Sequence, residues 1–329
     1  MMVSEKISQR RILVTARIHE AVADRLREAG EVIINPGIEP WTPDNVEALA
    51  RTCDAVMTFM PDRLGAPFFV APGRLKMLAC ALKGYDNFDI AAAVQAGVRV
   101  SIVPDLLTEP TAELAIGLAI GLARQVLAGD RLVRNGDFAG WRPVLYGTGL
   151  HQAIVAVVGL GKVGCAIIDR LAGFGCARIL GVDPQAVDSR VNMANLQEAA
   201  THADYLFLAA PLTPATRQMI GQHYLSQARP GQFIINVGRG SVADEDAIAI
   251  ALTSGRLGGY AADVFAFEDW ALDGRPAEIP PALREQPATL FTPHLGSAVA
   301  SVRLAIEHRA ASNILEFLAG RAPPDEIRS

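Results

Sequence analysis

Short apolar runs alternate with longer stretches of mixed apolar and polar residues along most of this chain. The runs are too short for buried helices and predict buried strands, whereas the mixed stretches have the periodicity of amphipathic helices. Because strands that alternate with helices form parallel sheets, the pattern predicts an α/β fold. The main predicted strands are 11–15, 32–34, 55–60, 77–80, 98–103, 154–158, 179–182, 205–209, 233–237, 259–265 and 289–292. The main predicted helices are 19–29, 43–51, 111–128, 165–173 and 298–318.

One predicted strand runs into a glycine-rich turn and then into a helix. Residues 154–158 are followed by Gly159, Gly161 and Gly164 in the spacing Gly-x-Gly-x-x-Gly. The first glycine permits a tight bend, the second lets backbone approach a pyrophosphate, and the third lets helix and strand pack closely. The next predicted strand ends in Asp183, where a carboxylate accepts hydrogen bonds from a ribose. These features predict a dinucleotide-binding unit; a βαβ unit without a ligand is the alternative.

The length and composition are those of a globular protein with more than one domain. A chain of 329 residues exceeds the usual size of one hydrophobic core, so we expect two domains. Half of the residues are apolar and 20% are charged, which excludes a disordered chain. The net charge of −5 does not indicate a basic surface that would bind nucleic acid.

Other classes of protein are disfavoured by particular segments. The cysteines Cys53, Cys80, Cys165 and Cys176 show no C-x-x-C pairing, so we expect reduced thiols and no metal site. The N-terminus, with Ser4, Glu5 and Lys6, lacks an apolar h-region, so we expect no signal peptide. The longest apolar run, 114–123, is too short to span a bilayer, and we expect a cytoplasmic protein with no membrane partner. The last segment, 321–329, is expected to fray.

Three predicted strands are followed by polar residues suited to catalysis. They are Arg239, Glu268 and His294. Ligands bind outside the carboxyl ends of strands in an open parallel sheet, so we expect these side chains near the glycine turn. An arginine, a carboxylate and a histidine can together bind an anion, move a proton and orient the base. The alternatives are a solvated loop cation, a surface carboxylate and a packing histidine.

Several motifs in sequence order resemble the D-isomer-specific 2-hydroxyacid dehydrogenases. They are Gly159-x-Gly161-x-x-Gly164 with Asp183, Arg239-Gly240-Ser241 with Asp244-Glu245, residues 259–265, and Thr292-Pro293-His294-x-Gly296-Ser297. The resemblance implies two Rossmann-like, doubly wound parallel-sheet domains, one of them flavodoxin-like. A cofactor domain of residues 107–295 would be inserted in a catalytic domain of residues 1–106 and 296–329. The resemblance also implies a homodimer, built largely on the helix that begins near Thr111.

The same resemblance assigns roles to individual residues. Arg239 would hold the substrate anion, His294 would be the acid/base, and Glu268 would orient His294. The cofactor-binding residues it implies are Gly159, Leu160, Gly161, Lys162, Val163, Gly164, Asp183, Pro211, Val237, Asp263, His294 and Gly296. For Asp263 a buried structural carboxylate is the alternative.

The cofactor expected is NAD rather than NADP. Asp183 would accept from the ribose hydroxyls and repel a 2′-phosphate, and Pro184 follows it. Arg178 and Arg190 lie nearby in the sequence and could soften this preference.

Within this family, the branch that oxidises phosphite fits best. The segments that resemble this branch are 59–63, 80–89, 104–108, 138–141, 146–150 and 265–270. In the second of them Lys83 stands before Gly84-Tyr85-Asp86-Asn87, where the family usually has a small or apolar residue. Phosphite is largely a dianion near neutral pH, so a second cation beside Arg239 would balance its charge. The substrate-binding residues so implied are Lys83, Gly84, Arg239, Met60, Leu107, Trp141 and Tyr146. A lysine exposed in a surface turn is the alternative for Lys83.

The predicted reaction is hydride transfer from phosphorus to NAD⁺, with His294 as general base on water and phosphate as product. One alternative is a D-2-hydroxyacid dehydrogenase that acts on glyoxylate or hydroxypyruvate. Another is a dinucleotide-sensing binding protein with little catalysis, against which the presence of His294 argues.

Overall fold

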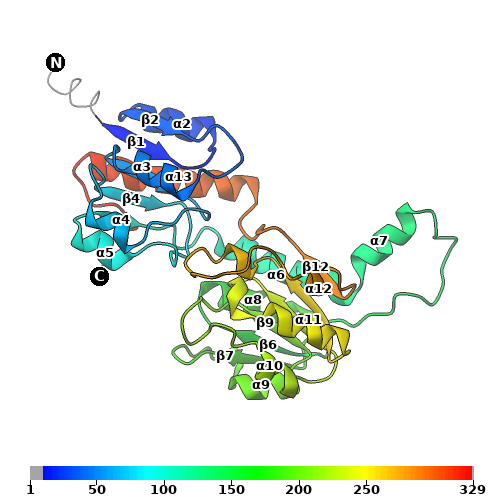
Figure 1. The fold of residues 1–329 in the computed structure, drawn as a ribbon. Coiled ribbons are helices and arrows are strands. Elements are labelled where there is room, and N and C mark those ends of the chain that lie inside the picture. Colours follow the sequence, from blue (N-terminus) through cyan, green and yellow to red (C-terminus); the bar gives the residue numbers. More distant parts are fainter. Residues whose placement is uncertain (1–9, 328–329) are drawn as a thin grey trace. The chain divides into compact units, whose positions relative to one another are not determined.

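The computed structural model describes residues 10–327, which form two compact units (Figure 1). The first unit takes the described residues up to Leu107, together with Trp270–Asp273 and those from Val299 onwards. The second unit takes Thr108–Asp269 and Gly274–Ala298. The short return of Trp270–Asp273 to the first unit was not foreseen from the sequence. Residues 1–6, where a signal peptide was not expected, lie outside the described residues.

The first unit is built on a parallel sheet of five strands in the order β2-β1-β3-β4-β5. This is the flavodoxin-like order. The strands are β1 (Arg11–Val14), β2 (Glu31–Ile34), β3 (Ala55–Thr58), β4 (Met77–Cys80) and β5 (Arg99–Ser101).

Helices cover both faces of this sheet, as the alternating side chains of its strands require. Leu13 and Val56 face α3 (Pro43–Ala50), α4 (Ala66–Val70) and α5 (Ile90–Gln95). Their sequence neighbours Ile12 and Ala55 face the opposite helices. Those helices are α2 (Glu20–Arg27) and α13 (Ala300–Leu318).

Residues 326 and 327 are attached to the first sheet, so the expected fraying of 321–329 is wrong for the described part. The N–H of Ile327 donates to the carbonyl of Val100 at 2.9 Å, along the open edge of β5. Arg99 pairs with Glu326 in the same place. These partners lie more than 200 residues apart, which is why the local sequence did not reveal them.

The second unit contains a parallel sheet of seven strands in the order β12-β11-β10-β9-β6-β7-β8. The strand order reverses at β6, and ligands of such sheets bind at this switch point. The strands are β6 (Ile154–Val158), β7 (Arg178–Val182), β8 (Asn192–Met193), β9 (Tyr205–Leu208), β10 (Gln232–Asn236), β11 (Leu257–Ala262) and β12 (Thr289–Phe291). The two sheets confirm the predicted α/β fold with parallel sheets.

Two layers of helices enclose the second sheet. One face packs on α6 (Thr108–Ala123) and α8 (Lys162–Leu171). The other packs on α9 (Leu196–His202), α10 (Gln222–Gln227) and α11 (Glu245–Thr253), with α12 (Pro281–Arg284) against α11. Three short 3₁₀ turns complete the unit: η1 (Ala172–Phe174), η2 (Gly240–Val242) and η3 (Ala266–Glu268).

The predicted helix 111–128 is interrupted. The chain bends by 63° between α6 and α7 (Val126–Arg134), and Gln125 adopts a left-handed conformation with φ of 52°. The carbonyl of Ala123, which a continuing helix would use, accepts the N–H of Thr148 instead. A segment 25 residues downstream therefore ends the helix, and no proline marks the break.

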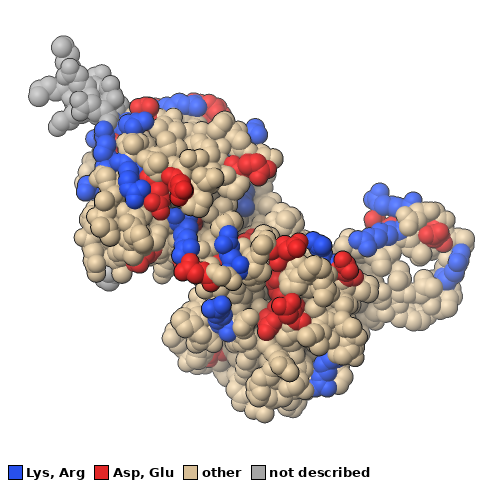
Figure 2. All heavy atoms as spheres, in the orientation of Figure 1, with Lys and Arg blue, Asp and Glu red and all other residues tan. Residues whose placement is uncertain are grey.

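Two surface properties bear on the sequence expectations. On the face shown in Figure 2, Lys and Arg side chains are scattered among Asp and Glu. In residues 10–327, no single helix is long and apolar enough to cross a membrane; the bent pair α6 and α7 meets that criterion only when both are counted together.

Candidate active site

The turn after β6 has the geometry that a dinucleotide requires. Gly159 has φ of +90°, and a Cβ there would lie 2.8 Å from the backbone of Ala210. A Cβ on Gly164 would lie 1.9 Å from the carbonyl oxygen of Gly159. A Cβ on Gly161 would meet nothing within 4 Å, so the space in front of the N-terminus of α8 is open. The turn thus fits a pyrophosphate held by helix N–H groups. The other predicted residues of this turn are Leu160, Lys162 and Val163.

Asp183 follows β7 and faces the glycine turn. Its Oδ2 accepts the N–H of Leu160 at 2.8 Å, and its Oδ1 accepts those of Gln185 and Ala186 at 2.8 and 2.9 Å. Burial opposes ionisation, but the three donors together hold the pKa of Asp183 below its usual value. Each carboxylate oxygen has two lone pairs, so Oδ1 is saturated by its two donors, whereas Oδ2 can still accept one ribose hydroxyl.

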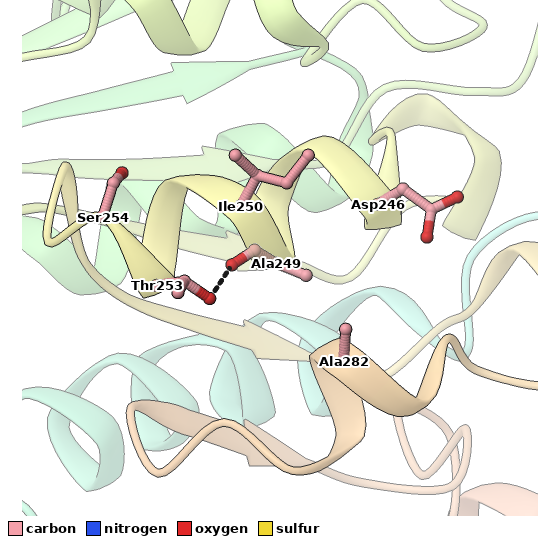
Figure 3. Close-up of a pocket in the computed structure, with 6 residues that line it drawn as sticks. All are labelled: Asp246, Ala249, Ile250, Thr253, Ser254 and Ala282. Atoms are coloured by element: carbon pink, nitrogen blue, oxygen red, sulfur yellow. Dashed lines mark hydrogen bonds between the residues drawn. The ribbon is translucent and has the colours of Figure 1, made fainter.

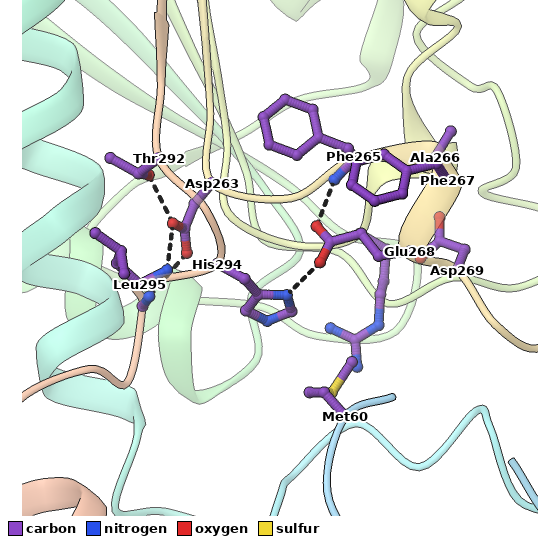
Figure 4. Close-up of polar contacts among 12 residues, drawn as sticks. Met60, Asp263, Phe265, Ala266, Phe267, Glu268, Asp269, Thr292, His294 and Leu295 are labelled. Atoms are coloured by element: carbon purple, nitrogen blue, oxygen red, sulfur yellow. Dashed lines mark hydrogen bonds and ion pairs between the residues drawn. The ribbon is translucent and has the colours of Figure 1, made fainter. Parts of the chain in front are cut away.

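Asp263 organises the loop that carries the histidine (Figure 4). This buried carboxylate accepts the Thr292 hydroxyl at 2.6 Å and the N–H groups of Leu295 and Gly296 at 2.6 and 2.8 Å. Burial raises the pKa of Asp263. These contacts support the structural alternative for Asp263; a contact with nicotinamide stays a prediction. The predicted residues Pro211 and Val237 follow β9 and β10 at the same edge of the sheet.

His294 is held in an uncommon backbone conformation. Its φ is 55°, a left-handed value that costs a residue other than glycine about 1 kcal/mol. Its N–H donates to the carbonyls of Asp263 at 2.9 Å and Thr292 at 3.0 Å, which stabilises this conformation. Strain of this kind is common at functional sites.

The structure brings the ring of His294 together with Glu268, the residue that the resemblance assigned to orient it (Figure 4). Nδ1 of His294 lies 3.0 Å from Oε2 of Glu268, and Oε1 of Glu268 accepts the N–H of Phe265 at 2.8 Å. The carboxylate favours a proton on Nδ1, so Nε2 is left to accept or donate a proton. Both side chains are partly accessible, at 29% for His294 and 20% for Glu268. The pair can therefore serve as an acid/base.

Arg239 lies half-buried just after β10, in a turn set by Asn236. Nδ2 of the buried Asn236 donates to the carbonyl of Arg239 at 3.0 Å, and its Oδ1 accepts the N–H of Gly238 at 3.1 Å. This role of Asn236 was not predicted from the sequence. Its position as the last residue of a buried strand was the available signal.

Two loops of the site are joined by direct backbone contact. A Cβ on Gly240 would lie 1.9 Å from the carbonyl carbon of Phe265, so the turn after Arg239 touches the turn that carries Glu268. The N–H of Ser241 also donates to Oδ2 of the buried Asp269 at 2.6 Å. The structure thereby brings the arginine and glutamate loops together.

Glu245 adds a third link; it belongs to the motif shared with the family, but this role was not predicted from the sequence. It is buried at the start of α11, and its Oε1 accepts the N–H of Ala266 at 2.8 Å. Its Oε2 has no hydrogen-bond partner among the described residues. Burial, reinforced by the carboxylates of Asp269, Asp246 and Glu268, raises the pKa of Glu245 to about 7. In the sequence it resembled an ordinary acidic residue of a first helical turn.

The remaining substrate candidates divide between the two units. Lys83 and Gly84 follow β4 and are half-buried, and Met60 follows β3. Nδ2 of Asn87 donates to the carbonyl of Met60 at 2.7 Å, which joins these two loops of the first unit. Leu107 packs, partly buried, against the α2 and α13 side of the first core. Their roles toward a substrate stay predictions.

The aromatic candidates belong to the second unit and are largely exposed. Trp141 has 83% of its surface accessible and Tyr146 has 76%. Within residues 10–327 neither is buried in a pocket, so the single chain gives no support to their predicted place around the substrate.

Two further features of the described residues bear on other kinds of site. Among the described residues, no group of His, Cys, Asp and Glu is arranged to hold a metal ion. A shallow depression of about 360 Å³ lies between α11 and α12 (Figure 3). Its lining is largely apolar and contains none of the predicted site residues. The residues that line it are Asp246, Ala249, Ile250, Thr253, Ser254 and Ala282.

The fold and the site agree with the comparison to known families. Residues 116–296 match the NAD-binding domain of the D-isomer specific 2-hydroxyacid dehydrogenases, and the chain belongs to this family. It is an NAD-dependent oxidoreductase, and the cofactor predicted from the glycine turn is confirmed.

Similar proteins of known name were also compared with this chain. Glyoxylate reductase from Thermococcus onnurineus is 30% identical over 323 residues, which cover 95% of this chain and 94% of that protein. The structure of the TT0316 protein from Thermus thermophilus has a TM-score of 0.88 and 30% identity, and covers 97% and 100% of the two chains. An NADPH-dependent glyoxylate/hydroxypyruvate reductase from Sinorhizobium meliloti, in complex with NADP and malonate, has a TM-score of 0.84 and 29% identity, and covers 97% of each chain. These names favour the oxoacid alternative over phosphite.

Proposed function

We propose that this protein oxidises phosphite to phosphate with NAD⁺. The observation that carries the proposal is Lys83, a half-buried cation directly after β4 in the loop fixed by Asn87 and Met60. Lysine occurs in this chain only at Lys6, Lys76, Lys83 and Lys162, whereas arginine supplies most cations.

The charge of the substrate favours two cations. A 2-hydroxy acid presents one carboxylate, which a single arginine and backbone donors can satisfy. Phosphite presents up to two negative charges on a compact centre, and Arg239 alone leaves one uncompensated in a site of low dielectric. Lys83 would supply the second positive charge.

The histidine and glutamate have a defined part in this reaction. Phosphite, water and NAD⁺ give phosphate, NADH and a proton; the bound nicotinamide would accept the hydride of the P–H bond. Nε2 of His294 would take the proton from the attacking water while Glu268 stabilises the charged ring through Nδ1. Arg239 and Lys83 would hold the anion and offset charge as the P–O bond forms.

Reduction of glyoxylate or a related 2-oxoacid is the second candidate, and the names of the relatives favour it. The same residues would then act in the opposite direction, with protonated His294 delivering a proton to the oxygen that becomes the hydroxyl. A single assay separates the candidates. The purified protein is given NAD⁺ with phosphite, glycerate or D-lactate, and NADH with glyoxylate or hydroxypyruvate, while nicotinamide absorbance is followed. Turnover of the organic acids alone would refute phosphite as the substrate.

Replacing Lys83 by alanine should raise KM for phosphite by roughly 10- to 100-fold, because a partly buried charge-assisted hydrogen bond is lost. Lys83→Arg should restore part of the affinity. The exposed Lys76→Ala is the matched control and should leave KM unchanged. An unaltered KM in Lys83→Ala would place this lysine outside the substrate site.

We also propose that the protein is a homodimer formed through α7 and the segment that follows it, which extends from its unit in Figure 1. No residue of α7 is buried, although a helix of nine residues needs packing to be stable. The long helix α6, predicted to form the interface, is instead largely buried in its own unit. Exposed apolar side chains gather on α7 and the following segment: Val126, Leu127, Val133, Phe138, Trp141, Val144, Leu145 and Tyr146.

Sedimentation velocity should give twice the chain mass of 35.0 kDa. The double variant Val133→Glu/Phe138→Glu should sediment as a monomer, because two charges would enter the apolar contact. Ile250→Glu, at a similarly exposed apolar position on α11, should remain dimeric. A wild-type monomer would refute the proposal.

A further inference from the structure

An arginine in the loop after β7 is neutralised by two carboxylates. Nε of Arg190 lies 2.9 and 3.1 Å from the two carboxylate oxygens of Asp188, and Nη2 also bonds to this carboxylate. Nη1 of Arg190 pairs with Asp169 on α8. Both edges of the guanidinium are therefore occupied. The side chain of Asp188 is only 10% exposed, whereas that of Arg190 is 43% exposed, so the pair lies at the surface with its carboxylate facing inward.

The loop that holds this ion cluster begins at Asp183, the predicted ribose acceptor. Asp188 is fixed from within the loop, because its Oδ1 accepts the backbone N–H of Arg190 at 2.9 Å. The hydrogen bonds from Arg190 hold the pKa of Asp188 well below its usual value, so this carboxylate stays charged. Asp183, Asp188 and Asp169 against one arginine leave the region with a net negative charge.

Arg178, the other arginine considered from the sequence, lies outside the loop that begins at Asp183. Arg178 is the first residue of β7, at the amino end of the strand, whereas the loop of Asp183 begins at its carboxyl end. Among the described residues between Arg178 and β8, only Arg190 is thus a cation in that loop.

We infer that Asp188 and Asp169 determine cofactor choice by withholding Arg190 from the 2′-phosphate of NADP. A 2′-phosphate is recognised by a free guanidinium edge, which donates two parallel hydrogen bonds. Here that edge is committed to Asp188, and the surrounding carboxylates repel a further anion. The selectivity for NAD then rests on a cluster of four residues rather than on Asp183 alone. The inference does not depend on which substrate is oxidised.

Binding measurements test this without turnover. Calorimetry gives the Kd of NADH and NADPH for Asp183→Asn, which removes the direct repulsion but keeps a hydrogen-bond acceptor. Adding Asp188→Asn, which retains the acceptor for the Arg190 N–H, should tighten NADPH roughly tenfold and leave NADH nearly unchanged. Adding Arg190→Ala to this double variant should abolish the gain. Asp183→Asn with Glu278→Gln is the matched control, since it breaks the exposed pair with Arg284 in the same unit.

If Asp188→Asn disturbs the loop, Asp169→Asn on the exposed face of α8 provides the same test from the other side of the arginine. An unchanged ratio of NADPH to NADH affinity in both variants would overturn the inference. A gain that survives Arg190→Ala would also overturn it, since relief of repulsion alone would then explain the result.

Discussion

The His294→Asn variant should lose about 10²- to 10⁴-fold in kcat, the usual contribution of a positioned acid/base. Asparagine tolerates the left-handed conformation that His294 adopts, with φ of 55°, so the backbone should remain in place. The ring that meets Glu268 is lost, and with it the group that moves the proton. Steady-state kinetics on the active substrate should show the loss in kcat, and calorimetry should show that NADH still binds.

Glu268→Gln tests the same pair from its other side. A glutamine can present an amide N–H to Nδ1, which would favour the tautomer with its proton on Nε2 and leave no base there. We therefore expect a large fall in kcat with little change in stability. His223→Asn, at an exposed histidine of α10, should behave as wild type. Near-normal kcat in His294→Asn would remove the histidine from the mechanism.

The sequence predicted those parts of the molecule that depend on local pattern. The buried strands, the glycine turn and Asp183 follow from short-range periodicity and spacing. The rule that ligands bind at the carboxyl edge of a parallel sheet then placed Glu268 and His294 at one edge, and the 3.0 Å contact between them agrees.

Other parts depend on contacts between distant residues. At the break after Ala123, the N–H of Thr148 donates to the carbonyl of Ala123, and no residue near the break indicates this contact in the sequence. The role of Glu245 requires the N–H of Ala266 and burial from several elements. Such contacts arise from tertiary packing, which a single sequence does not display.

Local sequence pattern also does not decide between phosphite and an oxoacid as the substrate. The glycine turn, Asp183 and the pair of His294 and Glu268 would serve any substrate of the family, because their proposed roles concern the cofactor and a proton. Only residues that contact the anion distinguish one substrate from another, and Lys83 is the strongest candidate proposed for such a contact. A family assignment and relatives of 30% identity therefore define the hydride transfer, whereas the substrate depends on few positions.

Gly240→Ala should lower kcat/KM by about 10²-fold, since displacements near 1 Å in a catalytic arrangement have effects of this size. The added Cβ would lie 1.9 Å from the carbonyl carbon of Phe265 and 2.2 Å from the nitrogen of Ala266. Both atoms are backbone, so the turns that carry Arg239 and Glu268 must separate. The free energy of unfolding should also fall by about 1–3 kcal/mol, as overpacking predicts. Urea denaturation and steady-state kinetics measure the two effects.

The clash is local, so the effect of Gly240→Ala on catalysis can be distinguished from a general loss of structure. The glycine turn and Asp183 lie on other strands, so the Kd of NADH should change little in Gly240→Ala, whereas KM for the anion should rise. Gly173→Ala is the matched control, because Gly173 is exposed and a Cβ there meets nothing within 4 Å. A Gly240→Ala enzyme with normal kcat/KM would mean that the arginine and glutamate loops need not touch for catalysis. The contacts of Ser241 with Asp269 and of Ala266 with Glu245 would then serve stability alone.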